Sequence, residues 1–266
     1  MGIGKSMHYK EKFLRFLLES QTLTFGEFPL ENGGKAPYMI NTGRCDTGVL
    51  LSRLSCFYAR TIYEKMELGI IPYNTSILFG SSYKSIPLAS SSAIALSAAF
   101  SRDIAYAFNI PAFNTREGYC PKKANYQNDG GLFVGMRPGP GDQILIIDDV
   151  VSSGTALHNA VGLLSAHAPE AKVIGAVVAV DRKESGHDAR LSAVAETQYE
   201  LGIPVFSIID VDDIVEILKS GTLVENWPAN GESDAMALRD LHWHEYEYKP
   251  ITMPTPKQIA ALEGYY

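Results

Sequence analysis

Two neighbouring aspartates close an apolar run and are followed by small polar residues and a glycine. Residues 144–147 are Ile-Leu-Ile-Ile, Asp148 and Asp149 follow, and residues 150–156 are Val-Val-Ser-Ser-Gly-Thr-Ala. Carboxylates accept hydrogen bonds from a vicinal diol, or help to hold a magnesium ion, but they do not bind phosphate. Backbone amides at the start of a helix supply the donors that a phosphate needs. The pattern therefore predicts a ribose-phosphate site, with acids for the sugar and amides for the phosphate.

The elements around this motif must place it at one edge of a sheet. The apolar, β-branched run predicts a buried strand of a parallel sheet, with both aspartates at its carboxyl end, where open α/β sheets bind ligands. Apolar residues at helical spacing from Leu157 to Leu164 predict a helix that begins near Thr155. Gly154 then lies in the connecting turn and allows close approach to a phosphate. A phospho-acceptor pocket or a bare metal site is the alternative, whereas a Walker A loop is excluded because no Gly-Lys-Ser/Thr follows the strand.

Two further strand ends carry basic residues. A buried strand is predicted at residues 76–79, followed by Gly-Ser-Ser-Tyr-Lys-Ser-Ile-Pro at 80–87 and an alanine-rich helix to about Phe100. Lys84 in this loop could meet a second phosphate group or be a solvated surface lysine. A third apolar strand, at residues 172–180, ends at Arg182, which could clamp a carboxylate or form a surface salt bridge.

Composition limits the class of protein. The chain has 266 residues, of which 46% are hydrophobic and 20% charged, as expected of a soluble α/β protein. A net charge of −7 argues against a nucleic-acid partner, and no apolar run is long enough to span a membrane. The three scattered cysteines indicate reduced thiols and hence a cytoplasmic location.

The order of the expected elements defines the organisation. Residues 1–70 are predicted to form an N-terminal helix and hood elements, and strands alternating with helices over residues 71–221 predict a parallel sheet covered on both faces. Residues 222–266 are expected to be an irregular C-terminal extension with a final helix near Pro256, all in a single folding unit. The polar stretch at 116–131 predicts a long loop of the kind that often covers an active site.

Taken together, these residues resemble the type I phosphoribosyltransferases, and most of all the orotate phosphoribosyltransferase family. The resemblance covers the chain from about His8 to Ser220. The similar segments are Phe25-Gly26-Glu27-Phe28, Pro37-Tyr38, Asn41-Thr42-Gly43, Phe79-Gly80 with Tyr83-Lys84 and Ile86-Pro87, Ile147 to Ala156, Asp181-Arg182 and Gly202-Ile203-Pro204-Val205.

The resemblance implies a type I phosphoribosyltransferase fold and a reaction in which orotate displaces pyrophosphate from phosphoribosyl pyrophosphate (PRPP), giving orotidine 5′-monophosphate. It implies Mg²⁺ as cofactor and a homodimer whose lid reaches into the neighbouring site. The catalytic residues it implies are Asp148, Asp149 and Lys84. The PRPP-binding residues it implies are Tyr83, Lys84, Arg116, Asp148, Asp149, Val150, Val151, Ser152, Ser153, Gly154, Thr155 and Ala156. For the acceptor it implies Met39, Ile40, Ser152 and Arg182, and for the lid Lys122 or Lys123; no metal ligand is directly assigned.

The chain departs from the family pattern at several positions. Glu31 stands where the family has a lysine, Thr115 where it has an arginine, and Met39 and Ile40 where it has two aromatics. The family's lid histidine has no counterpart, because no histidine occurs between His8 and His158. These departures keep two alternatives open: a diverged paralogue acting on another ribose-phosphate substrate or acceptor, and a non-catalytic protein that binds PRPP or a nucleotide.

Overall fold

A six-stranded sheet forms the centre of the computed structural model, which describes residues 3–29, 35–81, 83–109, 133–151, 154–184, 191–221, 223 and 251–265. The strand order is β5-β4-β3-β6-β7-β8, and neighbours are parallel except for β5, which runs antiparallel to β4 at the edge. The strands are β3 (Ile77–Gly80), β4 (Ala105–Asn109), β5 (Phe133–Gly135), β6 (Gln143–Val151), β7 (Lys172–Asp181) and β8 (Val205–Asp210).

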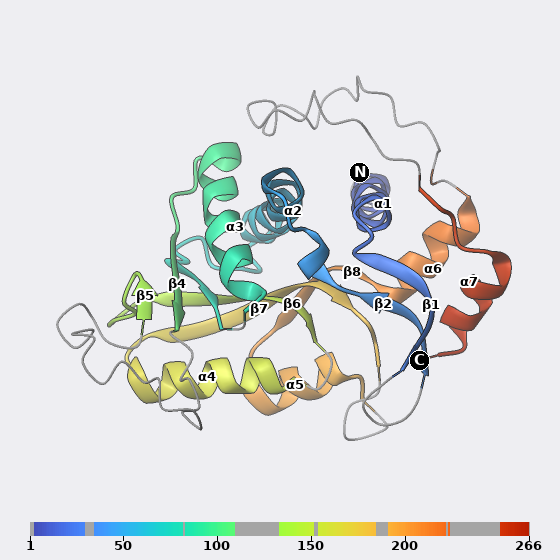
Figure 1. Cartoon of the computed structure of the whole chain (residues 1–266). Coiled ribbons are helices and arrows are strands. Elements are labelled where there is room, and N and C mark those ends of the chain that lie inside the picture. Colours follow the sequence, from blue (N-terminus) through green and yellow to red (C-terminus); the bar gives the residue numbers. More distant parts are fainter. Residues whose placement is uncertain are drawn as a thin grey trace, which may run out of the picture.

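Helices cover both faces of this sheet (Figure 1). One face carries α1 (Ile3–Glu19), α2 (Gly48–Glu67) and α3 (Ser85–Phe100), and the other carries α4 (Thr155–His167) and α5 (Ala193–Leu201). The strand β6 shows why both faces are needed, because its residues alternate between the two hydrophobic cores. Leu145 and Ile147 face the core under α1–α3, and Ile144 and Ile146 face the core under α4 and α5. The fold is therefore the doubly covered α/β sheet that the sequence predicts.

A hairpin and two helices lie beyond β8. The hairpin consists of β1 (Leu23–Pro29) and β2 (Lys35–Ile40), and a 3₁₀ turn (Thr42–Arg44) connects it to α2. The helices are α6 (Val211–Ser220) and α7 (Pro256–Glu263), and Figure 1 shows α7 beside α6 and the hairpin. The α7 residue Leu262 is fully buried in the core. None of the helices in the described ranges is long and apolar enough to span a membrane.

The strand β6 carries both aspartates near its carboxyl end, as the sequence predicts, and Asp148, Val150 and Val151 pair with β7. One expectation requires correction. The antiparallel β5 makes the sheet mixed rather than wholly parallel. The expected N-terminal helix is present and spans Ile3–Glu19. The sequence pattern did not predict β4, β5 or α5, whereas α4 begins at Thr155 and α7 at Pro256, as expected.

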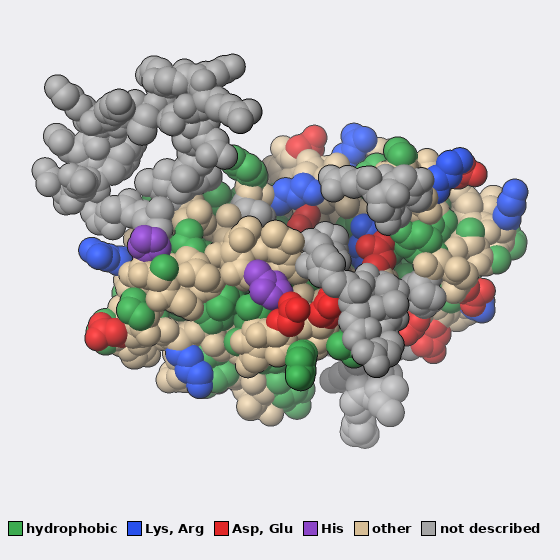
Figure 2. Space-filling view, turned by 90° about the horizontal axis from the view of Figure 1, so that it is seen from below, with side chains coloured by type: hydrophobic (Ala, Val, Ile, Leu, Met, Phe, Trp, Pro, Cys, Tyr) green, Lys and Arg blue, Asp and Glu red, His purple; other side chains and the backbone are tan. Residues whose placement is uncertain are grey.

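The face formed by α4 and α5 carries scattered charges. In Figure 2, which views the molecule from that side, the basic side chains of the described surface are dispersed among other residues instead of forming one patch.

Candidate active site

The two aspartates of β6 occupy very different environments. Consecutive residues of a strand point to opposite faces, so the two carboxylates diverge. Asp148 is 2% exposed, its Oδ1 accepts a hydrogen bond from the Asp149 amide (3.0 Å), and its carbonyl accepts one from the Tyr58 hydroxyl of α2 (2.7 Å). The Asp149 side chain is 15% exposed. Asp149 is thus the more accessible carboxylate, while contact between Asp148 and a sugar stays a prediction.

The Tyr58 hydroxyl stays protonated and donates a hydrogen bond to the Asp148 carbonyl. Burial, reinforced by the charges of Asp149 and Asp148, raises the pKa of Tyr58 well above its ordinary value. A neutral phenol keeps its proton and can donate it to the Asp148 carbonyl. Tyr58 therefore fixes β6 against α2 beneath the acids, a role that the sequence did not suggest.

Three separate elements converge on the Asp149 carboxylate. Thr42 Oγ1, between β2 and α2, donates to Asp149 Oδ2 (3.1 Å), and Lys84 Nζ, at the start of α3, lies 3.2 Å from the same oxygen. The Val150 amide donates to Oδ1 (3.0 Å). Because the Lys84 side chain is 48% exposed, its ion pair is weak and can be exchanged for another anion. The structure thus brings the predicted residues Lys84 and Asp149 together, and it adds Thr42.

The loop after β3 folds back tightly on the strand end. A Cβ on Gly80 would lie 2.4 Å from the Ser85 carbonyl oxygen, so only glycine fits there. Lys84 is the N-cap of α3 and forms no side-chain capping hydrogen bond, and Tyr83 is 77% exposed. The amides at the start of α3 therefore face the same sheet edge as Asp149, with an exposed tyrosine and lysine beside them.

The turn after β6 also depends on a glycine. Gly154 has φ 71° and ψ −9°, and a Cβ there would lie 2.2 Å from Thr197 Oγ1. Gly154 is the N-cap of α4, and as a glycine it has no side chain that could cap the helix. Thr155 and Ala156 are exposed, whereas Val151 is buried. This is the helix start that the sequence analysis assigned to a phosphate.

Arg182 follows β7 and is enclosed on one side by the hairpin. Its Nε donates to the Tyr38 hydroxyl (3.2 Å), and its guanidinium carbon lies 5.0 Å from the centroid of the Tyr38 ring. Its Nη2 lies 2.5 Å from Glu184 Oε1. Burial raises the pKa of Tyr38 to about 12, so the hydroxyl stays neutral and can accept from the arginine. Sequence reasoning gave no role to Tyr38 or Glu184, although the Arg-x-Glu spacing was a signal for the latter.

Met39 and Ile40 do not present their side chains together. Along β2, Tyr38 and Ile40 are buried, whereas Met39 is 41% exposed on the other face. At most one of Met39 and Ile40 can therefore face an acceptor with its side chain.

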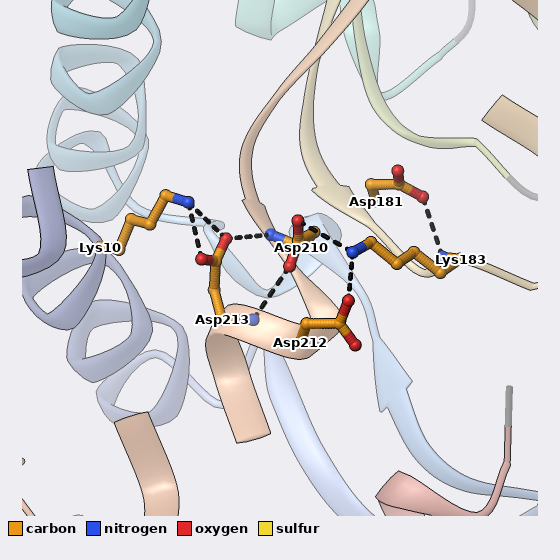
Figure 3. A network of polar contacts seen from close by, with 6 residues as sticks. All are labelled: Lys10, Asp181, Lys183, Asp210, Asp212 and Asp213. Atoms are coloured by element: carbon orange, nitrogen blue, oxygen red, sulfur yellow. Dashed lines mark hydrogen bonds and ion pairs between the residues drawn. The ribbon is translucent and has the colours of Figure 1, made fainter. Parts of the chain in front are cut away.

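A network of charged residues anchors the loop that carries Arg182 (Figure 3). The Lys183 amide donates to Asp181 Oδ1 (2.8 Å), and Lys183 Nζ pairs with Asp210 (3.3 Å) and Asp212 at the start of α6. Asp210 and Asp213 form a capping box, and Asp213 pairs with Lys10 of α1 (2.6 Å). The loop is thus tied to α6 and α1, although Lys183 has the unfavourable φ of 50°.

The pKa shifts in this network follow its contacts. Burial raises the pKa of Asp181. Burial alone would also raise the pKa of Asp210, but the Asp213 amide and the charge of Lys183 outweigh it and lower that pKa. Burial would lower the pKa of Lys183, yet its contacts with Asp212 and Asp210 raise it. The lysine is therefore held as a cation next to Arg182.

The donor set at this edge suits a metal ion that arrives with a substrate. Within the described ranges, no three histidine, cysteine or acidic side chains gather as a metal cage. Mg²⁺ commonly keeps several waters and binds one or two carboxylates together with substrate phosphates. Asp149 fits that pattern as a single accessible carboxylate beside two predicted phosphate sites.

Several residues named by the sequence analysis lie outside the described residues. They are Glu31, Thr115, Arg116, Lys122, Lys123, Ser152 and Ser153.

Comparison with known protein families shows which class of protein this chain belongs to. Residues 58–198, more than half of the chain, match the model of the phosphoribosyl transferase domain. This region contains β3, β6 and β7, whose carboxyl ends carry Lys84, the two aspartates and Arg182. Fold and motif are thus those of a phosphoribosyltransferase, as the resemblance implied.

Individual relatives show to which family of phosphoribosyltransferases the chain belongs. An orotate phosphoribosyltransferase of Bifidobacterium adolescentis is 40% identical over 215 residues, which cover 81% of this chain and 87% of the relative. One of Pseudomonas aeruginosa is 36% identical over 222 residues, covering 83% and 94%. The crystal structure of orotate phosphoribosyltransferase from Francisella tularensis superposes with a TM-score of 0.63 at 31% identity, covering 79% of this chain and 90% of the other. The chain belongs to the orotate phosphoribosyltransferase family.

Proposed function

We propose that this protein transfers the phosphoribosyl group of PRPP to N1 of orotate, forming orotidine 5′-monophosphate and releasing pyrophosphate and the N1 proton. The observation that carries the proposal is the order of charges along one sheet edge. The parallel strands β3, β6 and β7 are neighbours, and Lys84, Asp149 and Arg182 follow in that order at their carboxyl ends.

This order complements the reacting groups. In the transition state, a sugar with developing positive charge lies between an anionic leaving group and an anionic acceptor. A central acid flanked by a lysine and an arginine matches that alternation of charge. The start of α4 at Gly154 supplies amides for the 5′-phosphate at the same edge.

Asp149 is assigned the central role. Its carboxylate can accept from the ribose hydroxyls and stabilise the developing sugar cation, because a fixed charge acts strongly where water is partly excluded. Thr42 and the Val150 amide hold the carboxylate in place before the substrate arrives. Asp148 lies deeper and supports the strand through Tyr58, and its contact with the sugar is part of the proposal.

Lys84 and Arg182 are each assigned to one of the two anionic groups of the substrates. Lys84 exchanges its weak pair with Asp149 for the leaving pyrophosphate, whose charge it partly neutralises. Arg182 binds the acceptor carboxylate, a planar group that its guanidinium fits in a bidentate way. Specificity for an acidic base is thus assigned to Arg182, with Met39 or Ile40 along the base.

The finer parts of the proposal concern Mg²⁺, assembly and location. Mg²⁺ supplies charge neutralisation on the pyrophosphate, with Asp149 as the protein carboxylate within reach. The homodimer rests on the family resemblance and is tested by light scattering after gel filtration. A cytoplasmic location is supported by the small number and scattered spacing of the three cysteines, a pattern that is typical of reduced thiols.

An acceptor comparison tests the proposal. Purified protein with PRPP and Mg²⁺ is assayed against orotate, uracil and adenine, and nucleotide formation is followed by chromatography. We expect orotate to be used at least about 100-fold more efficiently than uracil, because uracil leaves Arg182 without its carboxylate partner. Equal or better use of another base would favour the diverged paralogue, and binding of PRPP without any turnover would favour the non-catalytic protein.

A further inference from the structure

The C-terminal segment of residues 251–265 is packed onto the fold. Its helix α7 begins with a capping box at Thr255 and with Pro256 at the first helical position. Leu262 is fully buried, and Ile251, Met253 and Ile259 lie against the same core. The match to the phosphoribosyl transferase domain ends at residue 198, so this segment lies outside it. Figure 1 shows this segment beside α6 and the β1–β2 hairpin.

Tyr265, directly beyond α7, contacts the residue that supports Arg182. Its ring meets the Tyr38 ring edge-on, with centroids 6.0 Å apart and an interplanar angle of 88°. This T-shaped arrangement is favourable for aromatic pairs. Tyr38 is the residue whose hydroxyl accepts from Arg182 and whose ring lies under the guanidinium. Tyr265 is thus one side chain away from the candidate acceptor site.

Tyr265 also contacts the carboxylate paired with Arg182. Burial, followed by the charge of Glu184 and a hydrogen bond to it, raises the pKa of Tyr265, so the phenol keeps its proton and is available as a donor near that carboxylate. Glu184 Oε1 is only 2.5 Å from Arg182 Nη2, yet within the described residues this buried oxygen receives no aligned hydrogen bond. The Glu184 carboxylate thus pairs with Arg182 and also lies near Tyr265, whose ring is anchored on Tyr38.

This arrangement creates a competition. The carboxylate of Glu184 occupies the guanidinium that the proposed function assigns to the acceptor carboxylate. The acceptor carboxylate can bind the Arg182 guanidinium in a bidentate way only if Glu184 releases part of its ion pair with Arg182. A hydroxyl that stabilises Glu184 from the other side lowers the cost of the exchange, because the displaced carboxylate keeps a donor.

We propose that Tyr265 is a positioning residue for the acceptor half of the site. Its hydroxyl holds Glu184 and its ring holds Tyr38, so that Arg182 can exchange its internal carboxylate for that of the acceptor. The C-terminal segment thereby sets the affinity for acidic acceptors. This inference rests on the proposed function, because it needs an acceptor that carries a carboxylate.

The first experiment removes only the hydroxyl. The Tyr265→Phe variant keeps the ring on Tyr38, and Tyr199→Phe, at an 84% exposed tyrosine on α5, is the matched control. We expect Y265F to raise the KM for orotate about three- to tenfold, with kcat, the KM for PRPP and the melting temperature unchanged. The control should change none of these.

The second experiment tests whether the effect passes through Glu184. Glu184→Gln removes the competing charge and is expected to lower the KM for orotate, and adding Y265F to it should have no further effect. An unchanged KM in Y265F, a raised KM in E184Q, or independent effects in the double variant would each overturn the inference while leaving the proposed function in place. A folded wild-type protein that does not turn over orotate would overturn the proposed function, and this inference with it.

Discussion

The ribose-phosphate half and the acceptor half of the site are built in opposite ways. The first lies in one continuous stretch, from Asp148 at the end of β6 to Ala156 in the first turn of α4. The second assembles Tyr38 of the hairpin, Arg182 and Glu184 after β7, and Tyr265 beyond α7. A local stretch supplies most of the first half, to which Thr42 and Lys84 add contacts, whereas tertiary packing assembles the second half from distant segments. Binding of PRPP thus depends on the motif from Asp148 to Ala156. The choice of acceptor depends on the residues that surround Arg182.

The two halves also treat charge differently. Asp149 pairs with a half-exposed lysine, an arrangement that a polyanionic substrate can open at little cost. Arg182 is only 15% exposed, lies over the Tyr38 ring and already has a carboxylate partner. We therefore expect the ribose-phosphate half to determine the rate of the reaction and the acceptor half to determine its specificity. The following variants test the two halves separately.

The largest effect is expected at the central acid. Asp149→Asn keeps the shape but removes the charge that favours the sugar cation, and kcat should fall about 10²–10³-fold. Initial rates with saturating PRPP and orotate measure this, with circular dichroism to verify the fold. Asp103→Asn, an exposed site between α3 and β4, is the control. If D149N kept more than about a third of wild-type activity, the ribose-phosphate half would not depend on this acid.

The turn at Gly154 should come next. Gly154→Ala combines a left-handed backbone with a contact of 2.2 Å to Thr197 Oγ1, and we expect a loss of about 2–4 kcal/mol in the free energy of unfolding, together with weaker PRPP binding. Urea unfolding measures the stability. Gly162→Ala, inside α4 with open space around it, should instead stabilise by up to about 1 kcal/mol. Similar results for the two variants would refute the assigned role of the turn.

A smaller change is expected from the acceptor arginine. Arg182→Lys keeps the positive charge but loses the planar pair of donors, so the KM for orotate should rise about tenfold. The KM for PRPP should stay the same, because the ribose-phosphate half is untouched. Steady-state titrations of both substrates give the two constants. Equal changes in both would mean that the halves are not separable.

The smallest effect concerns the network under the arginine loop. Because burial raises the pKa of Asp181 in the folded protein above the ordinary value of 3.8, the group favours folding only when protonated, and this contribution is lost as the pH rises through the folded-state pKa. Asp181→Asn should therefore stabilise at pH 7 by less than about 1 kcal/mol, with the gain vanishing toward pH 4. Urea unfolding at several pH values measures it, and a gain that grew toward low pH would contradict this account.

The sequence predicted the first half of the site better than the second. The apolar run at 144–147 and the helical spacing after Thr155 are local patterns, and both elements are present. The burial of Asp148 was not predicted, because the backbone pairing with β7 and the Tyr58 hydrogen bond involve other parts of the chain. Local spacing gives no sign of such a buried acid.

The acceptor half could not be predicted in this way. Arg182 was found because a basic residue follows a clear strand, but its partners come from the hairpin and from the C-terminal segment. Nothing in the spacing of Tyr38 and Tyr265 relates them, since only the packing of α7 beside β2 and α6 brings their rings together. The short strands β4 and β5 were missed for a similar reason, because their pairing partners define them more than their own residues do.

The most direct test of the central claim follows both products of one reaction. Purified protein is given PRPP, orotate and Mg²⁺, and the loss of orotate absorbance is compared with the release of pyrophosphate. We expect equal amounts of both, dependence on Mg²⁺, and a loss of both signals together in D149N. Folded wild-type protein that released pyrophosphate without consuming orotate, or that gave neither signal, would contradict the account.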